Sequence, residues 1–202
     1  MSLGDRLVAM PRIWNVLRRL LEANLRGEKA AVHAELRSWQ RESGLRVLDF
    51  GCGTGEMTAL FPLESYAGMD LSPIYVGYAR RVYGPRFQVM DGGALAYVDD
   101  AVDEGLVAGV FHHLPDEAVR CMARELARVL KPTGRLLVME DTPTRGWWNL
   151  PGRLIHALDQ GGYIRDEYEY FPLFAEYFSL EKTYPMRSGF CDYRVLVLRV
   201  KK

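Results

Sequence analysis

Hydrophobic positions along the chain follow two repeating patterns. Short, dense apolar runs bounded by turn residues are typical of buried strands, and we expect strands at residues 46–50, 65–70, 86–90, 103–108, 135–140, 178–184 and 193–200. Apolar stripes at helical spacing predict helices at residues 11–25, 28–43, 56–61, 73–82, 116–130 and 150–158. Strands that alternate with helices and end in a strand pair predict an α/β fold, a doubly wound sheet in three layers.

Two helices precede the first strand, and the first of them has two interpretations. Residues 11–25 carry an apolar stripe, with Arg12, Arg18 and Arg19 toward the other face. The favoured interpretation is a cover for one edge of the sheet. The alternative is that this helix also walls a substrate pocket.

The run at 103–108 is the weakest of the predicted strands. Glu104 and Gly105 stand where a buried parallel strand normally carries apolar residues. We nevertheless expect a strand over these residues.

Residues 141–177 form a connection far longer than compact domains usually need and rich in aromatic residues. We interpret this segment, together with the helix at 11–25, as the lid and walls of a substrate pocket. Gly161 and Gly162 would form the hinge of the lid, and Tyr163 and Arg165 could present a hydroxyl and a cation to the substrate. The alternative is that its aromatic side chains simply pack in the core.

Composition narrows the class of protein. The chain has 202 residues, 49% of them hydrophobic, which favours one domain with a substantial core. Lys plus Arg and Asp plus Glu both number 26, so no nucleic-acid partner is expected. The three cysteines form no metal-binding pair, and no signal peptide or long apolar span is evident. The sequence therefore predicts a cytoplasmic protein with free thiols and no metal.

Three glycines at every second position follow the first predicted strand. Without a Cβ atom, Gly51, Gly53 and Gly55 allow dihedral angles closed to other residues and let a ligand lie against the backbone. Dinucleotide-binding folds use G-x-G-x-x-G, whereas here the third glycine comes one residue earlier and Glu56 follows it. The spacing therefore argues against a pyrophosphate ligand.

Two acids end the next two predicted strands. Asp70 stands where an acid can accept hydrogen bonds from both ribose hydroxyls, and its neighbour Leu71 can pack on an adenine face. Asp91 and Gly92 follow the third strand, where a carboxylate and an amide match the edge of adenine. The alternatives are that Asp70 only caps the helix at 73–82 and that Asp91 only forms a turn.

The segment 49–55, D-x-G-x-G-x-G, resembles motif I of the class I S-adenosylmethionine (SAM) dependent methyltransferases at every fixed position. Two later phrases, GVFHHLPD and RVLKPTGRLLVMED, are also similar to that family. The segment MDGG departs from the usual G-D-A, and Thr133 replaces the second glycine of P-G-G. The resemblance covers about residues 46–140 and implies a Rossmann-like, mostly parallel seven-stranded sheet with a reversed, antiparallel last strand.

The resemblance implies that SAM is the cofactor and S-adenosylhomocysteine the product. The cofactor-binding residues it implies, together with those inferred above, are Asp49, Gly51, Cys52, Gly53, Gly55, Asp70, Leu71, Asp91, Gly92, Ala108, Gly109 and Val110. Cys52 is expected to pack rather than to act as a nucleophile. His113, or else His112, is the candidate general base, because both stand just beyond the fourth strand. Either histidine could instead cap a helix or pack.

We therefore expect a methyltransferase that acts on a small molecule. The predicted organisation is a single domain with N-terminal helices in 1–44, a cofactor-binding core in 45–140, the lid insert in 141–177 and terminal strands in 178–202. Two alternatives are a SAM-binding regulatory or partner subunit without catalysis and a nicotinamide or other nucleotide enzyme. Trp147 and Trp148 beside Arg145 and Arg153 permit a membrane surface or lipid-like acceptor, which is less favoured.

Overall fold

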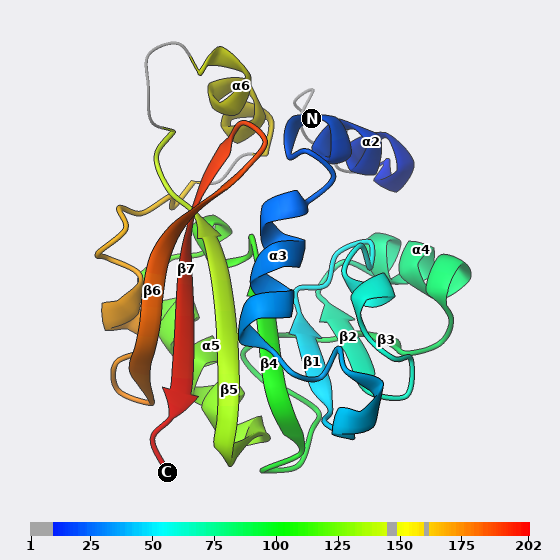
Figure 1. Cartoon of the computed structure of the whole chain (residues 1–202), viewed down its shortest axis with the longest axis vertical. Coiled ribbons are helices and arrows are strands. Elements are labelled where there is room, and N and C mark those ends of the chain that lie inside the picture. Colours follow the sequence, from blue (N-terminus) through cyan, green and yellow to red (C-terminus); the bar gives the residue numbers. More distant parts are fainter. Residues whose placement is uncertain (1–9, 145–148, 160–161) are drawn as a thin grey trace.

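The structure is a computed structural model that describes residues 10–144, 149–159 and 162–202. It contains one seven-stranded sheet in the order β3-β2-β1-β4-β5-β7-β6 (Figure 1). The strands are β1 (Val47–Phe50), β2 (Tyr66–Asp70), β3 (Phe87–Val89), β4 (Val102–Ala108), β5 (Leu130–Asp141), β6 (Phe178–Ser188) and β7 (Cys191–Val200). The first five pair in parallel, whereas β7 is antiparallel to both β5 and β6. The predicted fold class, including its antiparallel end, is confirmed.

Helices cover both faces of this sheet. The helices of the described residues are α2 (Pro11–Leu21), α3 (Arg26–Glu35), α4 (Pro73–Tyr83), α5 (Asp116–Val129) and α6 (Leu150–Asp159), of which α2 and α6 lie beyond one end of the sheet (Figure 1). In the view of Figure 1, α3 lies in front of the sheet and α5 behind it. Two apolar clusters result, one that contains α5 residues such as Leu126 and one that contains α3 residues such as Val32. None of the helices in the described part of the chain is long and apolar enough to cross a membrane.

Three helix predictions were too long. The first helix ends at Leu21 because Ala23, Asn24 and Leu25 take left-handed dihedrals, which an α-helix excludes. The helix expected at 28–43 ends at Glu35, and only a 3₁₀ turn follows at Arg41–Ser43. The helix expected after the glycine turn is a single 3₁₀ turn, Thr58–Leu60.

Glu104 explains both the early end of α3 and the unusual composition of β4. Its buried carboxylate accepts hydrogen bonds from the backbone amides of Arg37, at 2.9 and 3.0 Å, and Ser38, at 2.9 Å. These amides lie just beyond α3, where the backbone has turned extended. A charged residue in a buried strand is thus stabilised by amides from another element.

Candidate active site

A cavity of about 500 Å³ opens at the carboxyl ends of the parallel strands. Its walls come from the glycine turn after β1, the residues that follow β2, β3 and β4, and the inner face of α2. Ligands of doubly wound sheets bind at this edge. Of the residues singled out in the sequence, the cavity is lined by Gly51, Cys52, Gly53, Asp70, Leu71, Asp91, Gly92, Ala108, Gly109, Val110, His112 and His113.

The glycine turn forms one wall of the cavity. Gly51 and Gly53 have φ angles of +72° and +52°, in the left-handed region that favours glycine. A Cβ atom at Gly51 would lie 2.4 Å from Val110 Cγ2, whereas one at Gly53 would meet nothing within 4 Å. The backbone at Gly53 therefore borders open space, and a ligand can approach it closely.

Asp70 lies across the turn from this open space. Its Oδ2 accepts from the Gly53 amide at 2.9 Å, and its Oδ1 accepts from the Ser72 amide at 2.8 Å. Each carboxylate oxygen can accept a second hydrogen bond, so the side chain can also receive two hydroxyl groups. Burial raises the pKa of Asp70, although the two amides oppose this shift.

Asp91 lines the cavity after β3. Its Oδ1 accepts from the Gly93 amide at 2.8 Å, which fixes the carboxylate beside the turn. The lining around it is apolar and includes Met90, Leu71 and Met122. A flat apolar ring with a polar edge would suit this part of the cavity.

Asp49 and Gly55, two of the expected cofactor-binding residues, do not line the cavity. Asp49 is buried beneath the turn, where the Tyr66 hydroxyl donates to its Oδ2 at 2.5 Å. Burial raises the pKa of Asp49 to about 7. A Cβ atom at Gly55 would contact the rings of Tyr83 and Phe87. Both residues support the turn from behind, so any part in binding is indirect.

Cys52 lines the cavity but behaves as a packing residue. Its side chain is buried, and this burial raises the pKa of the thiol. A thiol held in its neutral form is a poor nucleophile.

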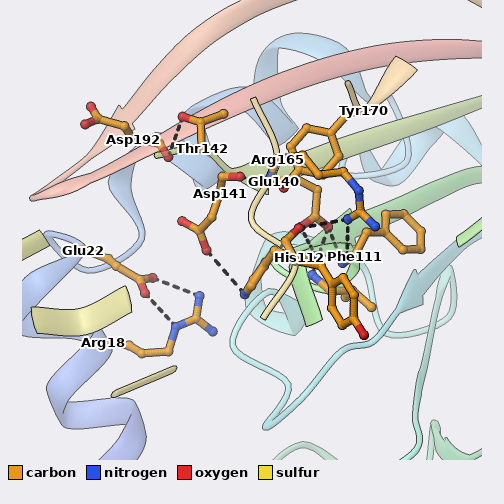
Figure 2. A network of polar contacts seen from close by, with 12 residues as sticks. Arg18, Glu22, Phe111, His112, Glu140, Asp141, Thr142, Arg165, Tyr170 and Asp192 are labelled. Carbon is orange, nitrogen blue, oxygen red and sulfur yellow. Dashed lines mark hydrogen bonds and ion pairs between the residues drawn. The ribbon is translucent and has the colours of Figure 1, made fainter. Parts of the chain in front are cut away.

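At the other end of the cavity the lining residue His112 contacts the buried carboxylate of Glu140 (Figure 2). Glu140, at the end of β5, accepts from the backbone amides of Val110 and Phe111 at 2.9 Å and of His112 at 3.2 Å. The ring Nδ1 of His112 lies 3.0 Å from the same carboxylate. Because Glu140 serves as an acceptor for three amides, Nδ1 carries the hydrogen that completes this contact.

Three further charged groups line this end of the cavity. The Oδ2 of Asp141 lies 3.6 Å from His112 Nε2, so the ring stands between two carboxylates (Figure 2). Arg18 on α2 binds Glu22 through two hydrogen bonds of 2.8 and 2.9 Å. Burial raises the pKa of Glu22 to about 7, and the Arg18 guanidinium opposes this shift.

The helix α2 forms part of the cavity wall, as the alternative interpretation of residues 11–25 predicts. Trp14 and Arg18 on the helix and Glu22 at its C-cap line the cavity. It is attached to the glycine turn by hydrogen bonds from Thr54 Oγ1 to Asn15, at 2.8 Å, and from Asn15 to Glu56, at 3.0 Å. These residues gave no signal in the sequence beyond the amphipathic stripe, because their partners lie about 40 positions away.

Residues 163–170 pack against the loop after β4 rather than into the cavity. The buried guanidinium of Arg165 donates to Asp116, at 2.7 and 3.0 Å, and to the carbonyl oxygens of Phe111 and Leu114. Arg165 therefore has its donors occupied, and the expectation that it offers a cation to the acceptor is wrong. Tyr163 does not line the cavity either.

The rest of the expected lid is described only in part. Arg145, Trp147, Trp148 and Gly161 lie outside the described residues. Tyr170 and Phe174 belong to the hydrophobic core, as the alternative interpretation of this segment predicts. Among the described residues of 141–177, only Asp141 lines the cavity. A lid role for this segment stays a prediction.

The donor set of this cavity fits SAM. The open backbone at Gly53 and the carboxylate of Asp70 suit a ribose, and the apolar lining beside Asp91 suits an adenine. Ala108, Gly109 and Val110 line the part of the cavity next to His112.

Comparison with known proteins points to the methyltransferases, the family that the sequence motifs resemble. A family model described as a methyltransferase domain matches residues 47–134. The demethylmenaquinone methyltransferase of Thermus thermophilus is 33% identical over 141 residues, which cover 64% of this chain and 61% of that protein. A tRNA (carboxymethyluridine(34)-5-O)-methyltransferase of Arabidopsis thaliana is 34% identical over 113 residues, 52% of this chain and 28% of that protein. The chain thus aligns with less than two thirds of the length of these relatives.

Solved structures share the fold at lower identity. A SAM-dependent methyltransferase from Aquifex aeolicus has a TM-score of 0.68 at 18% identity, and the match covers 96% of this chain and 98% of that one. A chain in the complex of the Haloferax volcanii Trm112 methyltransferase activator with the putative methyltransferase has a TM-score of 0.72 at 18% identity and covers 100% and 99%. At such identities the likeness concerns the fold alone.

Proposed function

Because this chain belongs to the class I SAM-dependent methyltransferases, we propose that it transfers a methyl group from SAM to a small-molecule acceptor. The observation that supports this proposal most is the single cavity in which the glycine turn, Asp70 and Asp91 meet a buried histidine. When bound, SAM supplies a methyl group on a positively charged sulfur, which is a good leaving group. The protein then has to hold the acceptor in line with that methyl group and remove a proton from it where necessary.

Three groups of the chain would hold the cofactor. Asp70 would accept from the ribose hydroxyls, and Asp91 with the Gly92 amide would meet the adenine edge. The backbone at Ala108–Val110 would border the methionine part. Each of these groups lines the cavity, and the carboxylates of Asp70 and Asp91 are fixed by backbone amides.

We assign the general base to His112 rather than to His113. The contact of Nδ1 with Glu140 directs the proton-accepting lone pair of the neutral ring to Nε2, on the side of Asp141. A proton taken from an acceptor hydroxyl or amine would give an imidazolium between two carboxylates, which stabilise its charge. His113 is exposed and its ring lies beside that of His112, with 4.0 Å between the ring centroids and an angle of 44° between the ring planes. The sequence favoured His113, but the polar contacts favour His112.

The competing functions differ in which ligands bind. A SAM-binding subunit without catalysis would bind S-adenosylhomocysteine but methylate no acceptor. A nicotinamide enzyme would bind NAD instead. One of the relatives is named for a tRNA substrate, but the balanced charge of this chain favours a small molecule. A cytoplasmic location stays a prediction.

Calorimetry with S-adenosylhomocysteine, SAM and NAD tests the proposal. We expect the first two to bind in a one-to-one ratio and NAD not to bind. A screen of metabolites with methyl-labelled SAM then identifies the acceptor. Binding of NAD alone, or of none of the three by folded protein, would refute the proposal.

A further inference from the structure

The helix α2 exposes apolar side chains on its outer face. Its inner face, toward the cavity, carries the buried Trp14 together with the polar groups of Asn15 and Arg18. Its outer face carries Val16 and Leu20, which are 57% and 72% exposed. A surface helix normally directs its apolar stripe to the core and its polar stripe to water. In α2 a second apolar stripe faces outward.

This outward stripe continues over two neighbouring elements. The amide of Phe190, at the tip of the β6–β7 hairpin, donates to Leu21 O of α2 at 2.9 Å. Its carbonyl accepts from Asn149, just before α6, at 2.7 Å. Figure 1 shows the hairpin tip between α6 and α2 at one end of the molecule. We call the exposed apolar residues of these three elements the apolar end; they are Ile13, Val16, Leu20, Leu150, Leu154 and Phe190.

Two exposed arginines lie among the residues of the apolar end. Arg12 on α2 is exposed, whereas Arg18 and Arg19 pair with Glu22 and Glu56. On α6, Arg153 is exposed between Leu150 and Leu154. An exposed apolar stripe flanked by arginines is complementary to a bilayer with anionic headgroups, which accepts apolar side chains and attracts cations.

We infer that the apolar end docks the protein on an anionic membrane surface. The same helix that presents Val16 and Leu20 to the bilayer lines the cavity with Trp14 and Arg18. Docking would therefore place the mouth of the cavity at the membrane, where amphiphilic molecules partition. The inference concerns binding to a surface and is independent of methyl transfer.

Vesicle co-sedimentation tests the inference. The full chain is mixed with vesicles of phosphatidylcholine alone and with vesicles that also contain phosphatidylglycerol. We expect binding to the anionic vesicles, weakened by about fivefold for each arginine removed in Arg12→Gln and Arg153→Gln. The double variant Val16→Glu/Leu20→Glu should bind about tenfold or more weakly.

The matched control is the double variant Leu63→Glu/Val98→Glu. These two residues are 52% and 77% exposed and precede β2 and β4, at the amino ends of the strands and thus at the opposite end of the sheet from the cavity. The control should bind vesicles like the unaltered chain, and circular dichroism and S-adenosylhomocysteine affinity confirm that each variant is folded.

Two outcomes would overturn the inference. One is a dimer in solution that Val16→Glu/Leu20→Glu converts to a monomer, which would make the apolar end a contact between copies. The other is a monomer that binds neither kind of vesicle, which would mean that another part of the chain covers this surface. Equal loss of binding in the control variant would also exclude a specific role for α2.

Discussion

The two ends of the cavity are built in different ways. At the cofactor end, short stretches that follow β1, β2 and β3 supply the groups, and carboxylates are fixed by nearby backbone amides, as when Asp70 accepts from Ser72. At the acceptor end, charged side chains bind partners far along the chain, as when Glu140 binds His112 and the preceding amides. The first end depends on backbone conformation, whereas the second depends on buried side-chain pairs. Substitutions should therefore affect binding at the first end and turnover at the second.

The largest effect is expected for His112. Replacing it in His112→Ala should lower turnover by about 100-fold or more, the usual contribution of a general base, and leave S-adenosylhomocysteine affinity within a few fold. Turnover with the acceptor found by screening and calorimetry measure the two quantities. His113→Ala is the control and should retain most activity. The reverse order of the two histidines would move the base to His113.

The next largest effect is expected for Glu140, which contributes to the stability of the fold and holds the ring of His112. Glu140→Gln places an amide NH₂ among backbone amide donors, so we expect the free energy of unfolding to fall by about 2–3 kcal/mol. Glu104→Gln is a matched control, because Glu104 is also buried and also accepts from two backbone amides. Chemical denaturation should show a similar loss for both variants.

NMR of the His112 ring distinguishes the role of Glu140 from that of Glu104. Nitrogen-15 NMR of the imidazole should show the ring hydrogen on Nδ1 in the unaltered chain and in Glu104→Gln. In Glu140→Gln the tautomer or the titration of His112 should change, because Nδ1 loses its carboxylate partner. An unchanged His112 spectrum would leave Glu140 with a role in folding alone.

Glu22 predicts how stability depends on pH. Burial raises its pKa from 4.5 to about 7, so between these values the folded state binds more protons than the unfolded state. The free energy of unfolding should therefore fall as pH rises through this window. Glu22→Gln should flatten that fall by about 1–2 kcal/mol, as measured by denaturation at pH 5 and pH 7.5. A slope unaffected by the substitution would mean that the Arg18 pair keeps Glu22 ionised.

The smallest effect on stability is expected for the ion pair that links α2 to the glycine turn. Arg19 on α2 binds Glu56 beside the glycine turn at 2.9 Å, with half of the arginine side chain exposed. Exposed ion pairs contribute little, so Arg19→Ala should lower the free energy of unfolding by less than about 1 kcal/mol. A double-mutant cycle with Glu56→Ala measures the coupling. A coupling above about 2 kcal/mol would show that this pair, rather than Asn15 and Thr54, attaches α2.

Sequence predicted which residues after β1, β2 and β3 line the cavity, because these signals are local; that they bind a cofactor stays a prediction. The glycine spacing, Asp70 and Asp91 follow individual strands, and the parallel sheet brings them to one edge. It predicted the mostly parallel seven-stranded sheet and its antiparallel end through the family resemblance. The roles of Asp49 and Gly55 in supporting the turn from behind were not predicted, because a spacing motif does not show which way a side chain points.

The acceptor end was largely hidden from sequence. The partners of Glu140 lie 28 to 30 positions away and those of Glu104 lie 66 and 67 positions away. Periodicity also overextended α3, because the end of that helix is fixed by Glu104 on a distant strand. Such contacts between a buried carboxylate and distant backbone amides can be recognised only once the fold places the strands side by side.

A crystal structure with bound S-adenosylhomocysteine tests the division of the cavity most directly. We expect the ribose to lie against Asp70, the adenine edge against Asp91 and Gly92, and the sulfur on the side of His112. A ligand that lies elsewhere on the molecule, or that places its adenine beside His112, would contradict it.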